Sequence, residues 1–304
     1  MMFRRCNRVI FCLIGLACTA GALAEIRWTP LNEPGVGGRL TSIRVDPQNP
    51  QVLFLGGDML GLAKSSNGGE TWERSKGLVS YEVADFSFDP KDRKVVWAGT
   101  MSGPHRSRDG GKTWNLAREG MPPISSNSYS APVERILFDP VNHKRLLAFG
   151  GNHRLWKSPG EPKWGVVWES LNGGDEWSEF SVVEEGANIM AAEWPDSKPE
   201  TIYTALGDAG IYRSDDGGQS WGSIRGGLPK GAAVNDLVVH PQNGNIIWAA
   251  LGSSFDSEKN LFLAGGIYKS MDGGMNWERA SEGLSQEDAS QKNQASWFKV
   301  VEVS

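Results

Sequence analysis

Apolar and polar residues alternate along this chain in short runs, a period of two that is typical of half-buried β-strands. Two such runs, separated by a proline-containing turn that is usually Asp-Pro or His-Pro, occur five times, from LTSIRVDPQNPQVLFLGG to VNDLVVHPQNGNIIWAALG. No stretch shows a sustained 3.6-residue apolar period, so helix is expected to be scarce. The pattern predicts an all-β protein built from repeats.

A turn motif of the form S-x-[D/N]-x-G-x-x-W follows each pair of runs. In this motif the Asp or Asn oxygen can accept hydrogen bonds from backbone N–H groups, Gly tolerates positive φ, and Trp can pack under the next strand. The structural residues of the five turns are predicted to be Asn67, Trp72, Asp109, Trp114, Asn172, Trp177, Asp216, Trp221, Asp272 and Trp277.

Each unit therefore contains strand a, a proline turn, strand b, a loop, strand c, the turn motif and strand d. A repeat of this kind, with a period of roughly 40 to 60 residues, is typical of four-stranded antiparallel β-propeller blades. Most units end in Gly-Leu or Gly-Met, and the third lacks this ending. Five full blades are predicted at about residues 40–79, 83–121, 133–181, 188–228 and 234–284.

The two ends of the chain resemble single strands of the repeat. Residues 25–32 resemble strand d, and residues 297–304 resemble strand a, so together they predict a shared or truncated blade. An unpaired sheet edge at this place would favour aggregation. We therefore expect the chain to be a fragment of a six- to eight-bladed ring.

The turn motif resembles the bacterial neuraminidase (BNR) or Asp-box repeat. This repeat occurs in sialidases, in sortilin-type and photosystem-assembly-factor propellers, and in the xyloglucanases of glycoside hydrolase family 74. The resemblance covers nearly all of the chain after residue 24 and implies the propeller fold. It implies less about function, because the turn is structural in families with unrelated activities.

Residues 1–24 have the features of an export signal. A basic segment with Arg4, Arg5 and Arg8 precedes an apolar run at 9–17, and Ala22-Leu23-Ala24 matches a cleavage site. A lipoprotein signal ending at Cys18 is the alternative. Cleavage near Ala24 predicts a periplasmic or secreted protein without a membrane span.

Composition excludes several kinds of site. All three cysteines, Cys6, Cys12 and Cys18, lie in the export signal, which excludes disulfides, thiolate zinc sites and a Cys nucleophile from the rest of the chain. Loss of that segment takes the formal charge from −5 to about −8, which argues against nucleic acid as a partner. No His spacing predicts a metal site, and no cofactor is expected.

The b–c and d–a loops share one face of such a blade, and the longest loops gather there. We expect the b–c loops of units one, three, four and five to line a groove that binds a polysaccharide or a protein partner. Aromatic rings in these loops can stack on sugars or, alternatively, pin the loops to neighbouring blades. The predicted ligand-binding residues are Trp156, Trp164, Arg154, Phe255, Phe262 and Asn260.

Asp58, in GDMLG, is the main catalytic candidate, and Asp208, in GDAGI, is a weaker one. In the xyloglucanases a similar segment carries the catalytic base, so the resemblance implies that role for Asp58, with the general acid on a second propeller. Both aspartates can instead cap tight turns. Two hypotheses follow: an inverting glycoside hydrolase acting on a β-glucan or xyloglucan, and a non-catalytic propeller that binds protein or glycan. Motifs for a sialidase, a serine hydrolase or an NTPase are not found.

Overall fold

The structure is a computed structural model. It describes residues 39–58, 61–80, 82–122, 132–150, 165–229, 232–252, 254–256, 261–263 and 265–282. For residue 39 and for residues 254–256 and 261–263, only the backbone strand is described. Within these ranges there is no helix, so none is long and apolar enough to cross a membrane.

Five four-stranded antiparallel sheets follow one another along the chain, which confirms the predicted all-β propeller class. The first two blades are β1 (Arg39–Asp46), β2 (Asn49–Asp58), β3 (Gly61–Ser65) and β4 (Glu73–Arg74), then β5 (Val83–Phe88), β6 (Val96–Thr100), β7 (His105–Ser107) and β8 (Asn115–Leu116). The third is β9 (Val133–Phe138), β10 (Leu146–Gly150), β11 (Val166–Ser170) and β12 (Ser178–Val182).

The fourth blade is β13 (Ala191–Glu193), β14 (Ile202–Ala205), β15 (Ile211–Ser214) and β16 (Gly222–Ser223). The fifth is β17 (Val234–His240), β18 (Asn243–Leu251), β21 (Gly266–Ser270) and β22 (Glu278–Arg279). A separate hairpin of β19 (Ser254–Asp256) and β20 (Leu261–Leu263) is inserted between its second and third strands.

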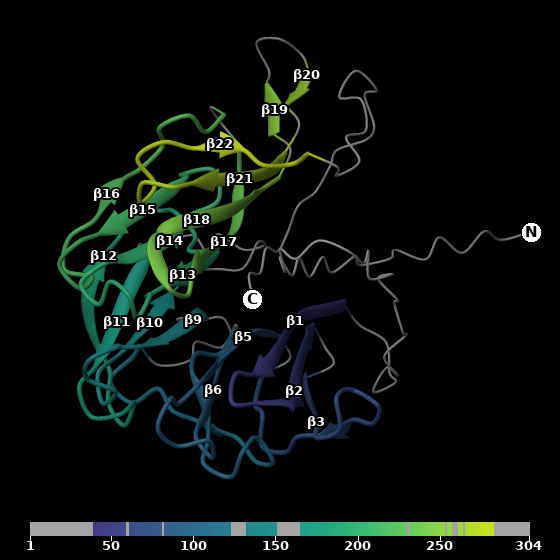
Figure 1. Ribbon diagram of the computed structural model, residues 1–304. Coiled ribbons are helices and arrows are strands. Elements are labelled where there is room, and N and C mark those ends of the chain that lie inside the picture. Colours follow the sequence, from purple (N-terminus) through teal and green to yellow (C-terminus); the bar gives the residue numbers. More distant parts are fainter. Residues whose placement is uncertain are drawn as a thin grey trace, which may run out of the picture.

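The blades are arranged along an arc, with β1, β5, β9, β13 and β17 on its inner side and the first and fifth blades at its two ends (Figure 1). Neighbouring inner strands contact each other. The proline turns that end most inner strands are closed by the residue before proline. The carboxylates of Asp46, Asp89 and Asp139 accept from the backbone N–H two residues on, and in the fifth blade His240 Nδ1 does the same.

A serine hydroxyl organises each turn motif. In the second blade, Ser107 Oγ accepts from the N–H groups of Asp109 and Gly111 and donates to the Asp109 carboxylate. That carboxylate accepts from the N–H groups of Lys112 and Thr113 and from the Thr113 hydroxyl. The same hydrogen bonds from the serine recur in all five turns, with Asn67 and Asn172 in place of aspartate.

The hydrophobic cores lie between consecutive blades rather than inside single ones. Trp114 packs edge-on against Phe54 of the preceding blade, with ring centroids 6.2 Å apart. Trp177 packs likewise against Trp97, at 5.8 Å. A Cβ added at Gly111 or Gly174 would overlap the Phe54 or Trp97 ring, and both glycines have positive φ. The turn glycines are therefore required by the close approach of the preceding blade as well as by the turn.

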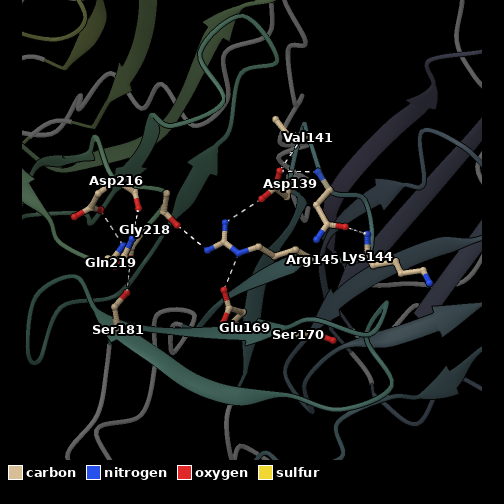
Figure 2. A network of polar contacts seen from close by, with 12 residues as sticks. Asp139, Val141, Lys144, Arg145, Glu169, Ser170, Ser181, Asp216, Gly218 and Gln219 are labelled. Atoms are coloured by element: carbon tan, nitrogen blue, oxygen red, sulfur yellow. Dashed lines mark hydrogen bonds and ion pairs between the residues drawn. The ribbon is translucent and has the colours of Figure 1, made fainter.

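A cation from each of the first four blades also reaches the turn of the next blade. It donates to the carbonyl oxygen of the first glycine of that turn, in the pairs Lys64–Gly110 (2.7 Å), Arg106–Gly173 (2.9 Å), Arg145–Gly217 (2.8 Å) and Arg213–Gly273 (3.0 Å). Figure 2 shows Arg145, which is also paired with Asp139 and Glu169. This contact joins blades whose sequences otherwise differ.

The Gly-Leu and Gly-Met endings serve the same interface. The residue before the glycine accepts from the N–H of the next blade's turn tryptophan, in the pairs Lys76–Trp114, Glu119–Trp177 and Gly226–Trp277, each at 2.8 Å. The glycines Gly77, Gly120 and Gly227 have positive φ, and a Cβ on any of them would overlap the carbonyl oxygen of that tryptophan. The third unit lacks the ending, and no such bond to Trp221 occurs among the described residues.

His105 links the second blade to the segment that leaves the first. It is fully buried, accepts at Nε2 from the N–H of Val79, and contacts Thr100 Oγ1 and the Gly103 carbonyl oxygen through Nδ1. These partners suit the neutral ring with its proton on Nδ1. Burial lowers the pKa of His105 to about 4; the hydrogen bond to Gly103 opposes this shift, and the nearby positive charge of Arg118 adds to it.

We predict that Ser107→Ala lowers the free energy of unfolding by about 1–3 kcal/mol, because it leaves the buried Gly111 N–H without its acceptor. Chemical denaturation measures the loss. Ser66→Ala, at an exposed position of the first turn motif, is the matched control and should change the stability by less than about 0.5 kcal/mol. Equal stabilities for the two variants would contradict the role of the serine hydroxyl.

We predict a stability loss of roughly 3 kcal/mol as the pH falls from 6.5 to 4, since the unfolded chain then binds a proton that folded His105 refuses. Denaturation of His105→Gln should show a flatter slope in this window. The Asp109→Asn variant should keep the slope of the parent protein. Burial raises the pKa of Asp109, but hydrogen bonds from Thr113 and Ser107 outweigh this effect and lower the pKa to about 2, so the contribution of this carboxylate to stability is lost only below pH 4. A slope unchanged in His105→Gln would refute the assignment.

Candidate functional site

Each of the five inner strands contributes one charged side chain to a network on the inner side of the arc. Arg44 Nε lies 2.7 Å from Asp85 Oδ1, and Arg135 Nη1 pairs with Asp85 Oδ2. Arg135 Nη2 lies 3.6 Å from Asp236 and 3.9 Å from Glu193. The network thus joins the inner strands of all five blades, including pairs that are not neighbours in the ring.

We call these five side chains the axial network, and its members stay charged and form ion pairs. The side chains of Asp85 and Arg135 are each 9% exposed, and Asp236 is 11% exposed. Guanidinium groups stay protonated, and every carboxylate in the network faces one of them. Removal of a single partner would leave an uncompensated buried charge. We conclude that the network fixes the relative positions of the inner strands.

Hydrophobic alternation did not predict this network, although the sequence carries a signal for it. Charged residues stand at the third position of VADFSF, VERILF and VNDLVV, inside runs that are otherwise largely apolar. A bulge follows the first residue of each of these strands, where the register of pairing shifts. The bulge changes which residues face inward, and alternation alone does not reveal it.

Asp58 is the last residue of β2 and lies where the first blade meets the second. It is half-buried and forms an isolated antiparallel bridge with Glu82, which is 9% exposed. The Glu82 carbonyl oxygen accepts from the N–H of Met101. Among the described side chains, the Asp58 carboxylate has no hydrogen-bond or ion-pair partner; Arg39, whose side chain is not described, stands opposite Asp58 in the β1–β2 pairing. Glu82, which the sequence analysis did not single out, is thus the acidic residue brought next to Asp58.

Asp208 lies in the turn between β14 and β15 and is exposed. The turn is closed by backbone bonds, from Ala209 to Leu206 and from Gly210 to Gly207, and the Asp208 carbonyl oxygen accepts from Arg225. Its carboxylate makes no hydrogen bond to this fully described turn. Asp58 and Asp208 belong to the first and fourth blades, and the structure does not bring them together.

Most of the predicted ligand-binding residues lie outside the described ranges: Trp156, Trp164, Arg154 and Asn260. Phe255 and Phe262 stand directly opposite each other in the β19–β20 hairpin. The sequence treated that segment as a long b–c loop of the fifth unit. The expected groove therefore remains a prediction.

A surface cleft of about 400 Å³ lies where the second blade meets the turn of the third. Three arginines line it, but each is already paired. Arg106 and Arg108 share Asp175, at 2.7 and 3.0 Å, and Arg118 donates to the carbonyl oxygens of Ser102 and Pro122. Hydrogen bonding to Arg106 lowers the pKa of Asp175, so this carboxylate stays charged. An anionic ligand would have to displace it.

Metal binding has no support in the described part of the chain, where no three His, Cys, Asp or Glu side chains gather. The structural candidates are therefore the Asp58–Glu82 bridge and the axial network. The carboxylates of the axial network face arginines, whereas Asp58 faces no cation among the described side chains.

The chain was compared with known proteins. No protein-family model matches the chain. It is 25% identical over 271 residues to a probable oligoxyloglucan-reducing end-specific xyloglucanase of Neosartorya fischeri, covering 77% of this chain and 30% of that protein. It is also 25% identical over 254 residues to xyloglucanase Xgh74A of Acetivibrio thermocellus, covering 72% and 30%.

Solved structures give a similar result. An ancestral GH74 enzyme superposes with a TM-score of 0.64 and 26% identity, over 86% of this chain and 33% of that one. The GH74 enzyme of Niastella koreensis gives 0.60 and 18%, over 79% and 38%, which supports the fold alone. The predicted resemblance to GH74 xyloglucanase propellers is confirmed, and the chain spans about a third of the length of these relatives.

Proposed function

We propose that this chain is a propeller of an extracellular glycoside hydrolase that binds and cleaves a β-glucan of the xyloglucan type. The observation that carries the proposal is the similarity to xyloglucanases along most of the chain, in sequence and in fold. Export through the segment 1–24 is part of the proposal, because such polysaccharides are found outside the cell.

In this proposal Asp58 is the general base, which removes a proton from the attacking water. A base needs a carboxylate that is not neutralised by a fixed cation; Asp58 faces none among the described side chains, whereas Asp85 and Asp236 face Arg135. Its place at the end of β2, on the loop side of the blade, is where function is usually carried on a rigid scaffold.

Inverting hydrolysis needs a general acid roughly 6.5–9.5 Å from the base. The resemblance to xyloglucanases implies that the acid comes from a second propeller, and the loops of the predicted groove would hold the glycan between the two. Sugar binding would rest on Trp156, Trp164, Phe255 and Phe262 as stacking surfaces, with Arg154 and Asn260 as hydrogen-bond partners.

The alternative is a non-catalytic propeller that binds a glycan or protein at the same loop face. The axial network favours it, because the buried carboxylates of Asp85 and Asp236 are committed to ion pairs. The two functions differ in one measurable respect: only the hydrolase releases reducing ends, whereas the alternative binds its glycan or protein without cleaving it.

We predict that Asp58→Ala lowers reducing-sugar release from xyloglucan about 100- to 10,000-fold, the usual contribution of a general base, with little change in melting temperature. Asp208→Ala is the matched control and should keep full activity, because its carboxylate is exposed and bound to nothing in its turn. Retention of activity in Asp58→Ala would exclude this base. Because the proposed general acid comes from a second propeller, the assay uses the protein extended to its natural end. Xyloglucan retention on an affinity gel without any release by that protein would favour the binding function.

A further inference from the structure

The cleft between the second and third blades has no role in the proposed function. Its volume of about 400 Å³ is within the range of about 300–1,000 Å³ that is usual for small-molecule sites. One wall comes from the outer strand β8 and the residues that follow it, and the other from the turn motif of the third blade. Asp58 and Asp208 belong to the first and fourth blades, so neither contributes to this cleft.

The acidic residue in this cleft, Asp175, is particular to this interface. At the same place in the turn motif stand Lys112 in the second blade, Gln219 in the fourth and Met275 in the fifth. Each of those turns also faces the blade before it. No other described interface between blades therefore has an acidic residue at this position of the turn.

Two arginines hold the Asp175 carboxylate in place. Arg106 Nη2 and Arg108 Nη2 lie 2.7 and 3.0 Å from the same oxygen, Oδ1. Arg106 is itself fixed, because its side chain is only 14% exposed, donates to the Gly173 carbonyl oxygen and lies over the Trp97 ring. The two ion pairs leave the second carboxylate oxygen, Oδ2, without a donor among the described residues.

The apolar part of the lining is also held in place. It consists of Leu116, Ala117 and Gly174. Trp114 donates through Nε1 within its own turn, but Trp177 donates across the interface to the Ala117 carbonyl oxygen at 2.9 Å. A ligand would therefore meet a preformed surface, which lowers the ordering cost of binding.

The charges of the lining are nearly balanced. Three arginines line the cleft with two carboxylates, those of Glu119 and Asp175, and Arg118 already donates to two backbone carbonyl oxygens. An anion would have to displace Asp175 and approach Glu119, whereas a cation would meet the arginines. A neutral ligand that both donates and accepts hydrogen bonds meets neither obstacle.

Hydrogen-bonding groups of both kinds are open to such a ligand. Asp175 Oδ2 is an acceptor, and the exposed Asn115 amide is a donor and an acceptor with no partner among the described residues. Arg108 is 62% exposed and has N–H groups besides the one that binds Asp175. Sugar hydroxyls match this set, because each of them donates and accepts.

We propose that this cleft is a second glycan-binding site, which holds a neutral saccharide at the outer rim of the second and third blades. Asp175 Oδ2 accepts from a sugar hydroxyl, Arg108 and Asn115 donate to sugar oxygens, and Leu116 and Ala117 contact the apolar face of the ring. The choice of a glucan rests on the proposed function, but this site needs neither the catalytic base nor a second propeller. A polysaccharide would be held here while it is cleaved elsewhere.

Two fluorescent labels test the proposal, because the chain after residue 24 contains no other cysteine to react. A label on Glu176→Cys, exposed beside Asp175, reports on the cleft, and a label on Asp208→Cys, exposed in the fourth blade, reports on the loop side. Each protein is titrated with a neutral xyloglucan oligosaccharide. We expect a saturable change of the label at Glu176→Cys that is the same at low and high salt, since the ligand carries no charge to be screened.

Substitutions in the cleft distinguish a neutral from an anionic ligand. Asp175→Ala removes an acceptor from the neutral saccharide and should weaken its binding about tenfold or more, whereas an anion would bind more tightly without this competitor. Asn115→Ala leaves the ion pairs intact and should weaken binding about two- to tenfold. Asp215→Ala, at a similarly exposed carboxylate that pairs with Arg213 in the fourth turn motif, is the matched control and should bind as the parent does.

Three outcomes would overturn the proposal. They are no response of the label at Glu176→Cys, tighter binding in Asp175→Ala, which would assign the cleft to anionic groups, and equal weakening by Asp175→Ala and Asp215→Ala. Failure of the proposed function has a different signature, which is a normal response of the cleft without release of reducing sugar. The response of the cleft should likewise persist in Asp58→Ala.

Discussion

The fold depends on one contact, the seating of each turn motif against the blade before it. A single-chain β-sheet of four short strands has too little core of its own, and here the cores lie between blades, around pairs such as Phe54 with Trp114 and Trp97 with Trp177. The glycines of the motif let an aromatic ring approach the backbone, and the carbonyl exposed by the turn accepts from a lysine or arginine. Sequence variation elsewhere in the blades is tolerated because this contact is conserved within the chain.

A second constraint acts on the inner side of the arc. Five strands approach one another there, and side chains on them form a network of two arginines and three carboxylates instead of apolar packing. A buried ion network adds little stability, but it requires a defined geometry, because each member must face its partner. Its charges are mutually satisfied, so the network specifies position and leaves chemistry to the loop side, where Asp58 ends β2.

Similarity to xyloglucanases extends over about three quarters of the chain and about a third of those proteins, and the glycan ligand and the catalytic base of this chain are proposals. The backbone bridge between Asp58 and Glu82 brings two acidic residues together where the first blade meets the second. In the proposed enzyme, the general acid comes from residues that another propeller supplies.

The sequence by itself determined the fold class and the turns, because hydrophobic alternation and the S-x-[D/N]-x-G-x-x-W motif are local signals. It also located the Gly-Leu endings, though not their purpose. Only the tertiary structure showed that Gly77 meets the backbone of Trp114, that Arg135 gathers acids from three other blades, and that Glu82 lies beside Asp58. These are contacts between residues far apart in the chain, and no local pattern encodes which blade faces which or where a bulge turns a side chain inward.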